Sequence, residues 1–420
     1  MLTPLLLLLA TLTCNAGNNL TRAEAEARAA TLWASHCAEV AADTVAPLPA
    51  PAPFDSVNPC VWHLPDSLEA DADMLFALAC EGSRPDSGRP LYIYLHGSGP
   101  RDAEWSTGRI LTSRWAAETG PSAWFVPRIP REGEYYRWWQ RAKLWAWERL
   151  LRRALASDEF DPARIYLLGI SEGGYGSQRL ASFYADYLAA AGPMAGGEPL
   201  VNNPTDNLRN TPFSLLTGSE DRMFCRNILT ARAAEELDSL SALWPGDYIH
   251  RVELQQGRGH GIDYSPTAPW LSRHSRRRSP RHITWEDFGL DGCRRRAFAN
   301  IEPLERPDSI DRIRYDLRID SLTNALTLTV DAVTYTPTEK DPVWGIALRN
   351  ERTLRPIDSG SVRIYLDDTM LDLDCPISVS INGRQFPPIR AVRSEATLRR
   401  AIDLWADPLR LYPASLTLRW

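Results

Sequence analysis

The sequence has no excess of basic residues. Its 420 residues include 47 Lys and Arg against 53 Asp and Glu, which gives a formal net charge of -6. Proteins that bind nucleic acid over a broad surface are usually basic, so this balance argues against a nucleic-acid partner. Residues 273–281 form one local basic stretch with five arginines. We interpret it as a solvated loop, and attraction of an acidic substrate or surface is the alternative.

Cysteine is also scarce, and its spacing does not indicate a metal site. None of the seven cysteines forms a Cys-x-x-Cys pair or a Cys/His cluster with zinc spacing. A structural or catalytic metal is therefore not indicated. No cofactor is expected either. Removal of the first 16 residues would leave six cysteines, an even number that is compatible with disulfides and with free buried thiols.

Long hydrophobic runs are missing, and the most apolar segment is a short one at the N-terminus. Leu5–Leu9 is an uninterrupted leucine run, followed by small and polar residues up to Ala16. A transmembrane helix needs about 20 apolar residues, so no transmembrane segment is predicted. Residues 1–16 instead predict a signal peptide and a secreted or periplasmic protein, although no Lys or Arg precedes the leucines. Lipidation at Cys14 is the alternative, which the preceding Leu12-Thr13 disfavours.

The next part of the chain, residues 17–60, predicts a helix and then a linker. A helical pattern covers residues 22–40 and begins after Thr21, with glutamates in its first turns. The proline-rich residues 47–53 predict an extended linker.

Short apolar runs and helical patterns alternate between residues 61 and 302. Strands are expected within 62–80 and at 91–95, 123–126, 164–168, 190–195, 213–216 and 249–254. Helices are expected at 138–155, from Ser171 to about residue 190, and at 227–243. Near-continuous apolar strands separated by helices indicate a doubly wound, mostly parallel sheet with helices on both faces.

The pattern changes again in residues 303–420. Apolar and polar residues alternate at 313–319, 325–330, 362–366, 377–381 and 415–420. Asn382-Gly383 is a strong hairpin signal. We expect a small, mainly β C-terminal domain, whose role in carbohydrate binding, assembly or bracing stays open.

The clearest chemical signal is Ser171 in Gly169-Ile-Ser-Glu-Gly173. The serine follows a predicted strand and precedes a predicted helix. A sharp strand-to-helix turn needs neighbours without side chains and exposes the hydroxyl as a nucleophile. The backbone N–H of Glu172 would lie at the helix N-terminus, where it can stabilise an oxyanion.

Together with His96-Gly-Ser-Gly99 and two later loops, this motif resembles the α/β-hydrolase family. Within it, residues 60–300 are similar to exported bacterial esterases related to polyhydroxybutyrate depolymerases, and to the prolyl-oligopeptidase-like catalytic domain. The resemblance implies a nucleophile, an acid and a histidine in that order. It also implies a second oxyanion N–H from Gly97 or Ser98, where many lipases have His-Gly-Gly-Gly.

Two loops supply the remaining candidates. Asp221 follows the strand 213–216, with Glu220 and Asp206 as poorer candidates for the acid. His260 lies among glycines after the strand 249–254 and is the expected base.

The expected function is hydrolysis of carboxylic esters, small or polymeric, through a Ser-His-Asp triad. Plant or microbial polysaccharide esters would suit the aromatic residues of 135–147, although packing of the helix on the sheet is the preferred interpretation of these side chains. The alternatives are a prolyl-oligopeptidase-like peptidase and a non-catalytic envelope binding protein on the same fold. The acyl group, the leaving group and the oligomeric state stay open.

Overall fold

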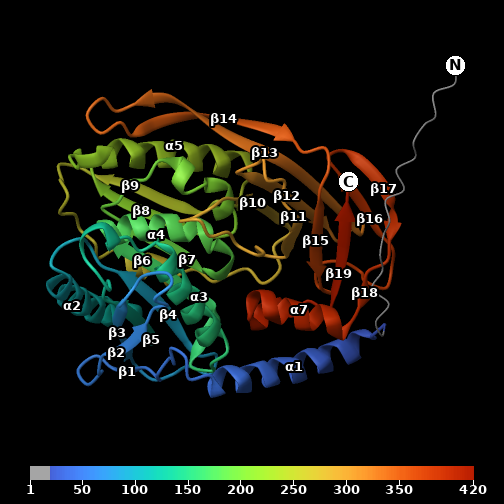
Figure 1. The fold of residues 1–420 in the computed structure, drawn as a ribbon, viewed down its shortest axis with the longest axis horizontal. Coiled ribbons are helices and arrows are strands. Elements are labelled where there is room, and N and C mark those ends of the chain that lie inside the picture. The colour runs from blue at the N-terminus through green and yellow to red at the C-terminus, as the bar shows by residue number, and fades with distance from the viewer. Residues whose placement is uncertain (1–18) are drawn as a thin grey trace.

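The computed structural model describes residues 19–420, so the predicted signal peptide and Cys14 lie outside the described residues. One large sheet with flanking helices is built from the first two thirds of the chain, and two smaller sheets follow (Figure 1). Within residues 19–420, no helix combines the length and the apolarity needed to cross a membrane.

The large sheet has nine strands in the order β1-β3-β5-β4-β6-β7-β8-β9, with β2 paired to β3. The strands are β1 (Ala52–Pro53), β2 (Cys60–His63), β3 (Asp73–Glu81), β4 (Arg89–Leu95), β5 (Ser122–Pro127), β6 (Phe160–Ile170), β7 (Ala190–Met194), β8 (Phe213–Gly218) and β9 (His250–Gln255). From β5 to β9 all neighbours are parallel, and β3 is antiparallel to β5. This strand order is that of the α/β-hydrolase fold, and the predicted fold class is confirmed.

Helices cover both faces of this sheet because alternate residues of each buried strand point to opposite sides. The helices are α2 (Arg101–Thr119), α3 (Arg141–Leu155), α4 (Glu172–Phe183), α5 (Arg226–Leu243) and α6 (Thr267–Leu271). Buried residues of α3, α4 and α5 form one core cluster with alternate strand residues such as Leu91 and Ile93. Those of α2 and α6 form another cluster with the intervening Tyr92 and Tyr94.

Two boundaries differ from the prediction. The helix after Ser171 ends at Phe183, well before residue 190, because a short 3-10 turn leads directly into β7. The strand expected at 164–168 begins earlier, at Phe160, so Asp161-Pro162 lies inside β6.

The C-terminal strands form a six-stranded and a four-stranded sheet. The first has the order β10-β12-β13-β16-β17 with β14 paired to β13, and the second has the order β11-β15-β19-β18. The strands are β10 (His282–Asp287), β11 (Ile301–Glu305), β12 (Ile313–Asp320), β13 (Ala325–Lys340), β14 (Ala347–Pro356), β15 (Ser361–Leu366), β16 (Ile377–Ile381), β17 (Arg384–Ile389), β18 (Val392–Arg393) and β19 (Ala414–Arg419). β16 and β17 pair across Asn382-Gly383, as the turn signal predicted. β10 precedes the predicted boundary at residue 302 and yet pairs with β12.

Two helices lie side by side below these sheets (Figure 1). They are α1 (Arg22–Ala42) and α7 (Glu395–Trp405). Thr21 caps α1 in a capping box with Glu24, which explains why the helix begins where the sequence predicted. Leu32 of α1 packs against Leu398 and Ile402 of α7.

Buried arginine pairs connect the two parts of the chain. Arg276 makes two bonds to Asp407, with Nη1–Oδ2 at 2.7 Å and Nη2–Oδ1 at 2.9 Å. The side chain of Arg276 is only 6% exposed, so the interpretation of residues 273–281 as a wholly solvated loop is wrong at this position. Arg276 is buried because it pairs with the buried carboxylate of Asp407, and a buried charge without a partner would be strongly destabilising. The same carboxylate also pairs with Arg410.

Candidate active site

Ser171 occupies a strained turn between β6 and α4. Its φ and ψ are 56° and -114°, in a region that residues other than glycine rarely adopt. Its backbone N–H donates to the Met194 carbonyl at 3.0 Å, and its carbonyl accepts from Tyr175 N–H at 3.0 Å. The serine is thereby fixed at the carboxyl edge of the sheet, where open α/β sheets place their ligands.

The neighbouring glycines are required by close backbone approaches. A Cβ on Gly169 would lie 2.3 Å from the Gly173 carbonyl oxygen, and one on Gly173 would lie 1.9 Å from the Leu95 carbonyl oxygen. A Cβ on Gly174 would lie 2.3 Å from the Met194 carbonyl oxygen. These distances are far below van der Waals contact, so the turn can form only with glycine at these positions.

His260 and Asp221 lie in a hydrogen-bonded row with the serine. His260 Nδ1 is 2.6 Å from Asp221 Oδ2, and His260 Nε2 is 3.0 Å from Ser171 Oγ. Because a carboxylate only accepts, Nδ1 carries the proton and Nε2 is free to accept the serine hydroxyl. Asp221 is 3% exposed, whereas the His260 side chain is 44% exposed and reachable from solvent.

The other acid candidates lie elsewhere. Glu220 is half exposed and pairs with Arg222 at 2.7 Å. Asp206 is buried and pairs with Arg314 and Arg352 from the C-terminal sheet, which hold its pKa below the usual range despite burial. Of the three carboxylates, only Asp221 contacts His260.

The loop after β4 packs directly against the serine. A Cβ on Gly97 would lie 3.3 Å from Ser171 Cβ, so the predicted oxyanion loop passes beside Ser171. The Tyr136 hydroxyl holds this loop by donating to the Gly97 carbonyl at 2.5 Å and accepting from Gly99 N–H at 3.4 Å. Ser98 lies between these two anchored glycines.

His96 at the start of the same loop is a structural residue. It is fully buried, and burial lowers its pKa to about 4. Its Nε2 accepts from Ile129 N–H at 3.0 Å, which leaves the proton on Nδ1 to donate to the Gly97 carbonyl at 2.8 Å. The Trp138 indole N–H donates to the His96 carbonyl at 3.0 Å.

Two carboxyl groups, one next to Ser171 and one next to the Gly97 loop, have raised pKa values. Burial raises the pKa of Glu172 to about 7, with Arg137 opposing the shift and Glu198 adding to it. Its Oε2 lies 3.2 Å from Arg137 Nη1, and its buried Oε1 has no hydrogen-bond partner. Burial also raises the pKa of Glu104 on α2, although a hydrogen bond with the Gly97 backbone opposes the shift.

The aromatic residues of the predicted platform divide into two groups. Trp138 and Trp147 are buried in the core, which confirms the interpretation of these two as packing residues. Trp139 is partly exposed and lies under the Arg179 guanidinium, 4.1 Å from the ring centroid. Arg179 in turn donates to both carboxylate oxygens of Glu198, from Nε to Oε1 at 2.6 Å and from Nη2 to Oε2 at 3.0 Å.

One residue that contacts Asp221 was not predicted from the sequence. Arg226 Nη1 donates to Asp221 Oδ1 at 3.0 Å, and the Arg226 side chain is 7% exposed. A basic residue five positions after the acid would have been the available signal, but it was indistinguishable from the many other arginines of the chain.

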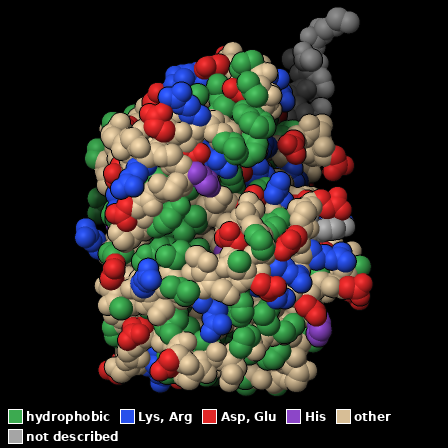
Figure 2. Space-filling view, turned by 90° about the vertical axis from the view of Figure 1, so that its left-hand side faces the viewer, with side chains coloured by type: hydrophobic (Ala, Val, Ile, Leu, Met, Phe, Trp, Pro, Cys, Tyr) green, Lys and Arg blue, Asp and Glu red, His purple; other side chains and the backbone are tan. Residues whose placement is uncertain are grey.

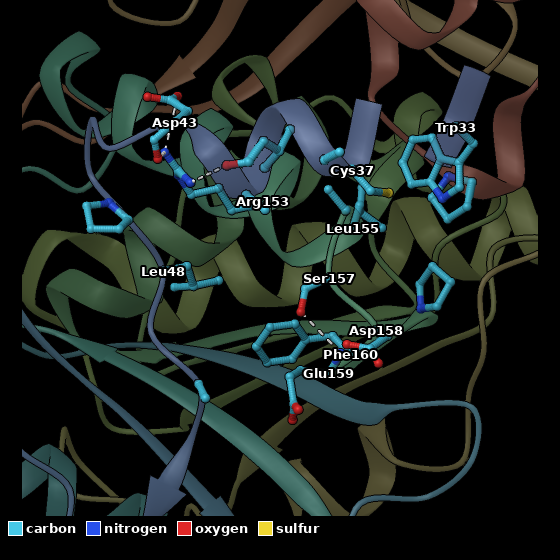
Figure 3. A pocket seen from close by; sticks show the side chains of 18 of the residues that line it. Trp33, Cys37, Asp43, Leu48, Arg153, Leu155, Ser157, Asp158, Glu159 and Phe160 are labelled. Carbon is cyan, nitrogen blue, oxygen red and sulfur yellow. Dashed lines mark hydrogen bonds and ion pairs between the residues drawn. The ribbon is translucent and has the colours of Figure 1, made fainter. Parts of the chain in front are cut away.

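A cavity of about 870 Å³ lies away from the serine (Figure 3). It is bounded by α1, the proline-rich segment and the start of β6, with Trp33, Leu48 and Phe160 among its lining residues. Phe160 opens β6 and Ser171 follows its end, so the cavity and the serine lie at opposite edges of the sheet. In the part of the chain after residue 18, all six cysteines are free thiols, with Cys37 lining this cavity.

The strand order and the turn at Ser171 are those of the α/β-hydrolase fold. No protein-family model matches the chain, and no curated protein matches it. Among solved structures, a thermostable esterase is similar over 53% of this chain and 64% of its own length, at 20% identity and a TM-score of 0.43. The match thus spans less than two thirds of that esterase.

Two further solved structures are similar over about half of this chain. A ferulic acid esterase matches over 52% of this chain and 98% of its own length, at 15% identity and a TM-score of 0.40. The poly(3-hydroxybutyrate) depolymerase LpqC from Bordetella parapertussis matches over 52% and 87%, at 15% identity and a TM-score of 0.36. The strand order and the serine turn of this chain define its fold independently of these matches.

Proposed function

We propose that this protein is a serine hydrolase that cleaves carboxylic esters, with Ser171 as nucleophile, His260 as general base and Asp221 as the acid. The observation that carries the proposal is the row of hydrogen bonds from Asp221 Oδ2 through His260 to Ser171 Oγ, at 2.6 and 3.0 Å. The strained backbone of Ser171 adds support, because residues other than glycine keep such φ and ψ values mainly at functional sites.

In the proposed mechanism, His260 Nε2 takes the hydroxyl proton as Ser171 Oγ attacks the ester carbonyl. Asp221 keeps the imidazole in the required tautomer and stabilises the imidazolium that forms. His260 then gives the proton to the leaving alcohol, and an acyl-enzyme remains on Ser171. A water molecule, activated by the same histidine, releases the acid.

The oxyanion of the tetrahedral intermediate would be held by backbone N–H groups. The Glu172 N–H stands at the N-terminus of α4, where it has no partner within the helix. Gly97 and Ser98 lie in the loop beside Ser171 and are the candidates for the second donor. Each such donor typically contributes about 10²–10³ in kcat.

Among acyl substrates, an ester is easier to cleave at this site than an amide. Its alkoxide leaves more readily than an amine, so a triad and two amide donors suffice for turnover. Trp139 and the arginines beside Glu172 offer an aromatic face and hydrogen bonds near the nucleophile, which would suit the esters of decorated polysaccharides. The leucine run before Ala16 supports export of the enzyme as part of the same proposal.

The test compares the turnover of p-nitrophenyl acetate with that of peptide p-nitroanilides. We expect ester turnover by the wild type, and its loss in Ser171→Ala with an unchanged circular dichroism spectrum. Ser239→Ala is the matched control, since Ser239 is exposed on α5 and only donates to the Glu235 carbonyl. Preference for the anilides would favour the peptidase, and full activity of Ser171→Ala would refute the nucleophile.

A further inference from the structure

The hairpin formed by β13 and β14 extends from the C-terminal sheet across α5 (Figure 1). Its turn, residues 341–346, meets the segment that follows the triad acid. There the rings of Trp344 and Phe224 are tilted against each other with centroids 4.5 Å apart. Residues more than 100 positions apart thus form a contact three residues from Asp221.

An apolar and a polar contact reinforce this junction. Cys225 and Leu229 form a buried cluster with Leu348 of β14, and Ile346 packs against it. The Asp341 carboxylate accepts the backbone N–H groups of Val343 and Trp344, which fixes the turn. Burial and the neighbouring Asp341 carboxylate raise the pKa of the Cys225 thiol to about 11.

The segment held in this way is strained. Phe224 and Cys225 are consecutive residues with left-handed backbones, at φ 54° and 59°. Neither is glycine, so in each the Cβ atom crowds the backbone, and contacts with the surrounding structure must offset this strain. The hairpin supplies a contact to both residues, namely Trp344 to Phe224 and the Leu348 cluster to Cys225.

The strained segment leads directly to Arg226, which contacts the triad. The Arg226 guanidinium donates to Asp221 Oδ1. It also contacts two rings, 5.2 Å from the Phe224 centroid and 5.5 Å from the Tyr175 centroid. A continuous series of contacts therefore runs from Trp344 through Phe224 and Arg226 to Asp221.

From these contacts we propose that the turn of the β13–β14 hairpin is a clamp that positions the triad acid. Trp344 is its positioning residue: it holds the left-handed Phe224–Cys225 segment, which in turn places Arg226 against Asp221. The hairpin thereby gives the C-terminal part of the chain a role in catalysis. This inference rests on the proposed function, because it concerns the acid of the proposed triad.

The same junction is partly open to solvent, which makes it accessible to mutation. Met223, Phe224, Val343 and Trp344 are 57%, 37%, 76% and 48% exposed. Figure 2 faces this end of the molecule, and hydrophobic side chains gather in its upper part, where the hairpin turns. A substrate platform on these exposed side chains is the competing role, and the experiment below distinguishes it from a clamp.

The experiment measures kcat and KM for p-nitrophenyl acetate in Trp344→Ala, Trp344→Phe and the control Leu354→Ala. Leu354 is an exposed apolar residue on β14 of the same hairpin, 42% exposed and distant in sequence from the turn. A small displacement of a catalytic group typically costs about 10²-fold in rate. We expect kcat of Trp344→Ala to fall at least 10-fold with KM unchanged, Trp344→Phe to recover most of the loss, and Leu354→Ala to match the wild type.

Hydrogen exchange of the amides of residues 222–228 provides a second readout that does not depend on activity. The clamp predicts faster exchange in Trp344→Ala and unchanged exchange in Leu354→Ala. Unchanged kcat, or a rise in KM alone, would overturn the clamp while leaving the proposed function intact. If the wild type has no hydrolase activity, the proposed function fails, and the exchange measurement alone decides whether the hairpin restrains this segment.

Discussion

Replacement of Glu172 by Gln should change the pH dependence of stability in a defined direction. Glu172 is 8% exposed, and burial raises the pKa of its carboxyl from 4.5 to about 7. The folded protein therefore binds this proton more tightly than the unfolded chain does. Between pH 4.5 and 7 the folded state holds more protons, so stability falls as the pH rises through that window. The carboxyl thus opposes folding most strongly above pH 7.

The size of the stability change follows from the pKa shift of Glu172. A difference of one pKa unit corresponds to about 1.4 kcal/mol, so the shift from 4.5 to about 7 costs at most about 3.5 kcal/mol at pH 8. Gln has the shape of the protonated acid and no charge. We expect Glu172→Gln to be more stable than the wild type at pH 8 by about 1–3 kcal/mol, and nearly equal in stability at pH 4.5.

Urea unfolding at both pH values, followed by tryptophan fluorescence, measures this difference. Glu118→Gln is the matched control, because Glu118 is exposed on α2 and should give the same small change at both pH values. A stability difference for Glu172→Gln that is independent of pH, or larger at pH 4.5, would refute the reasoning from burial.

Three further predictions concern Asp221, the glycine turn around Ser171, and the buried ion pair of Arg410 and Asp407. Asp221→Asn should lower kcat by about 10³–10⁴ in ester turnover with an unchanged fold, and a loss below 10-fold would remove Asp221 from the mechanism. Gly173→Ala should reduce soluble yield and the melting temperature, since its Cβ would lie 1.9 Å from a backbone carbonyl oxygen; a wild-type melting temperature would contradict the close packing of the turn. Arg410→Ala should lower stability by about 3–5 kcal/mol in urea, because it removes a cation buried beside Asp407, whereas Arg399→Ala on the exposed face of α7 should cost under about 1 kcal/mol; equal losses would argue against the buried pair.

The large sheet could be predicted because its strands are buried on both faces. Continuous apolar runs such as 91–95 and 213–216 stand out from the helical patterns between them. The serine turn could be predicted because Gly169, Ser171 and Gly173 are close in sequence and their chemistry is local. The candidates Asp221 and His260 came from the order of acid and histidine that the α/β-hydrolase resemblance implies, applied to the loops after the strands.

The elements that escaped prediction lack a local pattern. α2 was missed because its buried positions include Gly108 and Thr112 beside its tryptophans, which breaks the apolar stripe. β14 was missed because most of its residues are exposed on both faces, so apolar and polar residues do not alternate. The long hairpin owes its place to pairing with β13 and to contacts with α5, which lie far away in the sequence.

The surroundings of the candidate site could not be predicted for a related reason. The contacts of Arg226 with Asp221 and of Trp344 with Phe224 exist only after the chain has folded. In a sequence whose 47 basic residues are nearly all arginine, no pattern singles out the one beside the acid. The raised pKa of Glu172 likewise comes from burial and from the charge of Glu198, which is distant in sequence.

Covalent labelling of the nucleophile tests the central claim most directly. The protein is treated with a fluorophosphonate, digested, and the adduct is located by mass spectrometry in the wild type, Ser171→Ala and His260→Ala. The proposed triad predicts one adduct, on Ser171, that is absent from Ser171→Ala and forms much more slowly in His260→Ala. A folded wild type that stays unlabelled, or an adduct on another serine, would contradict it.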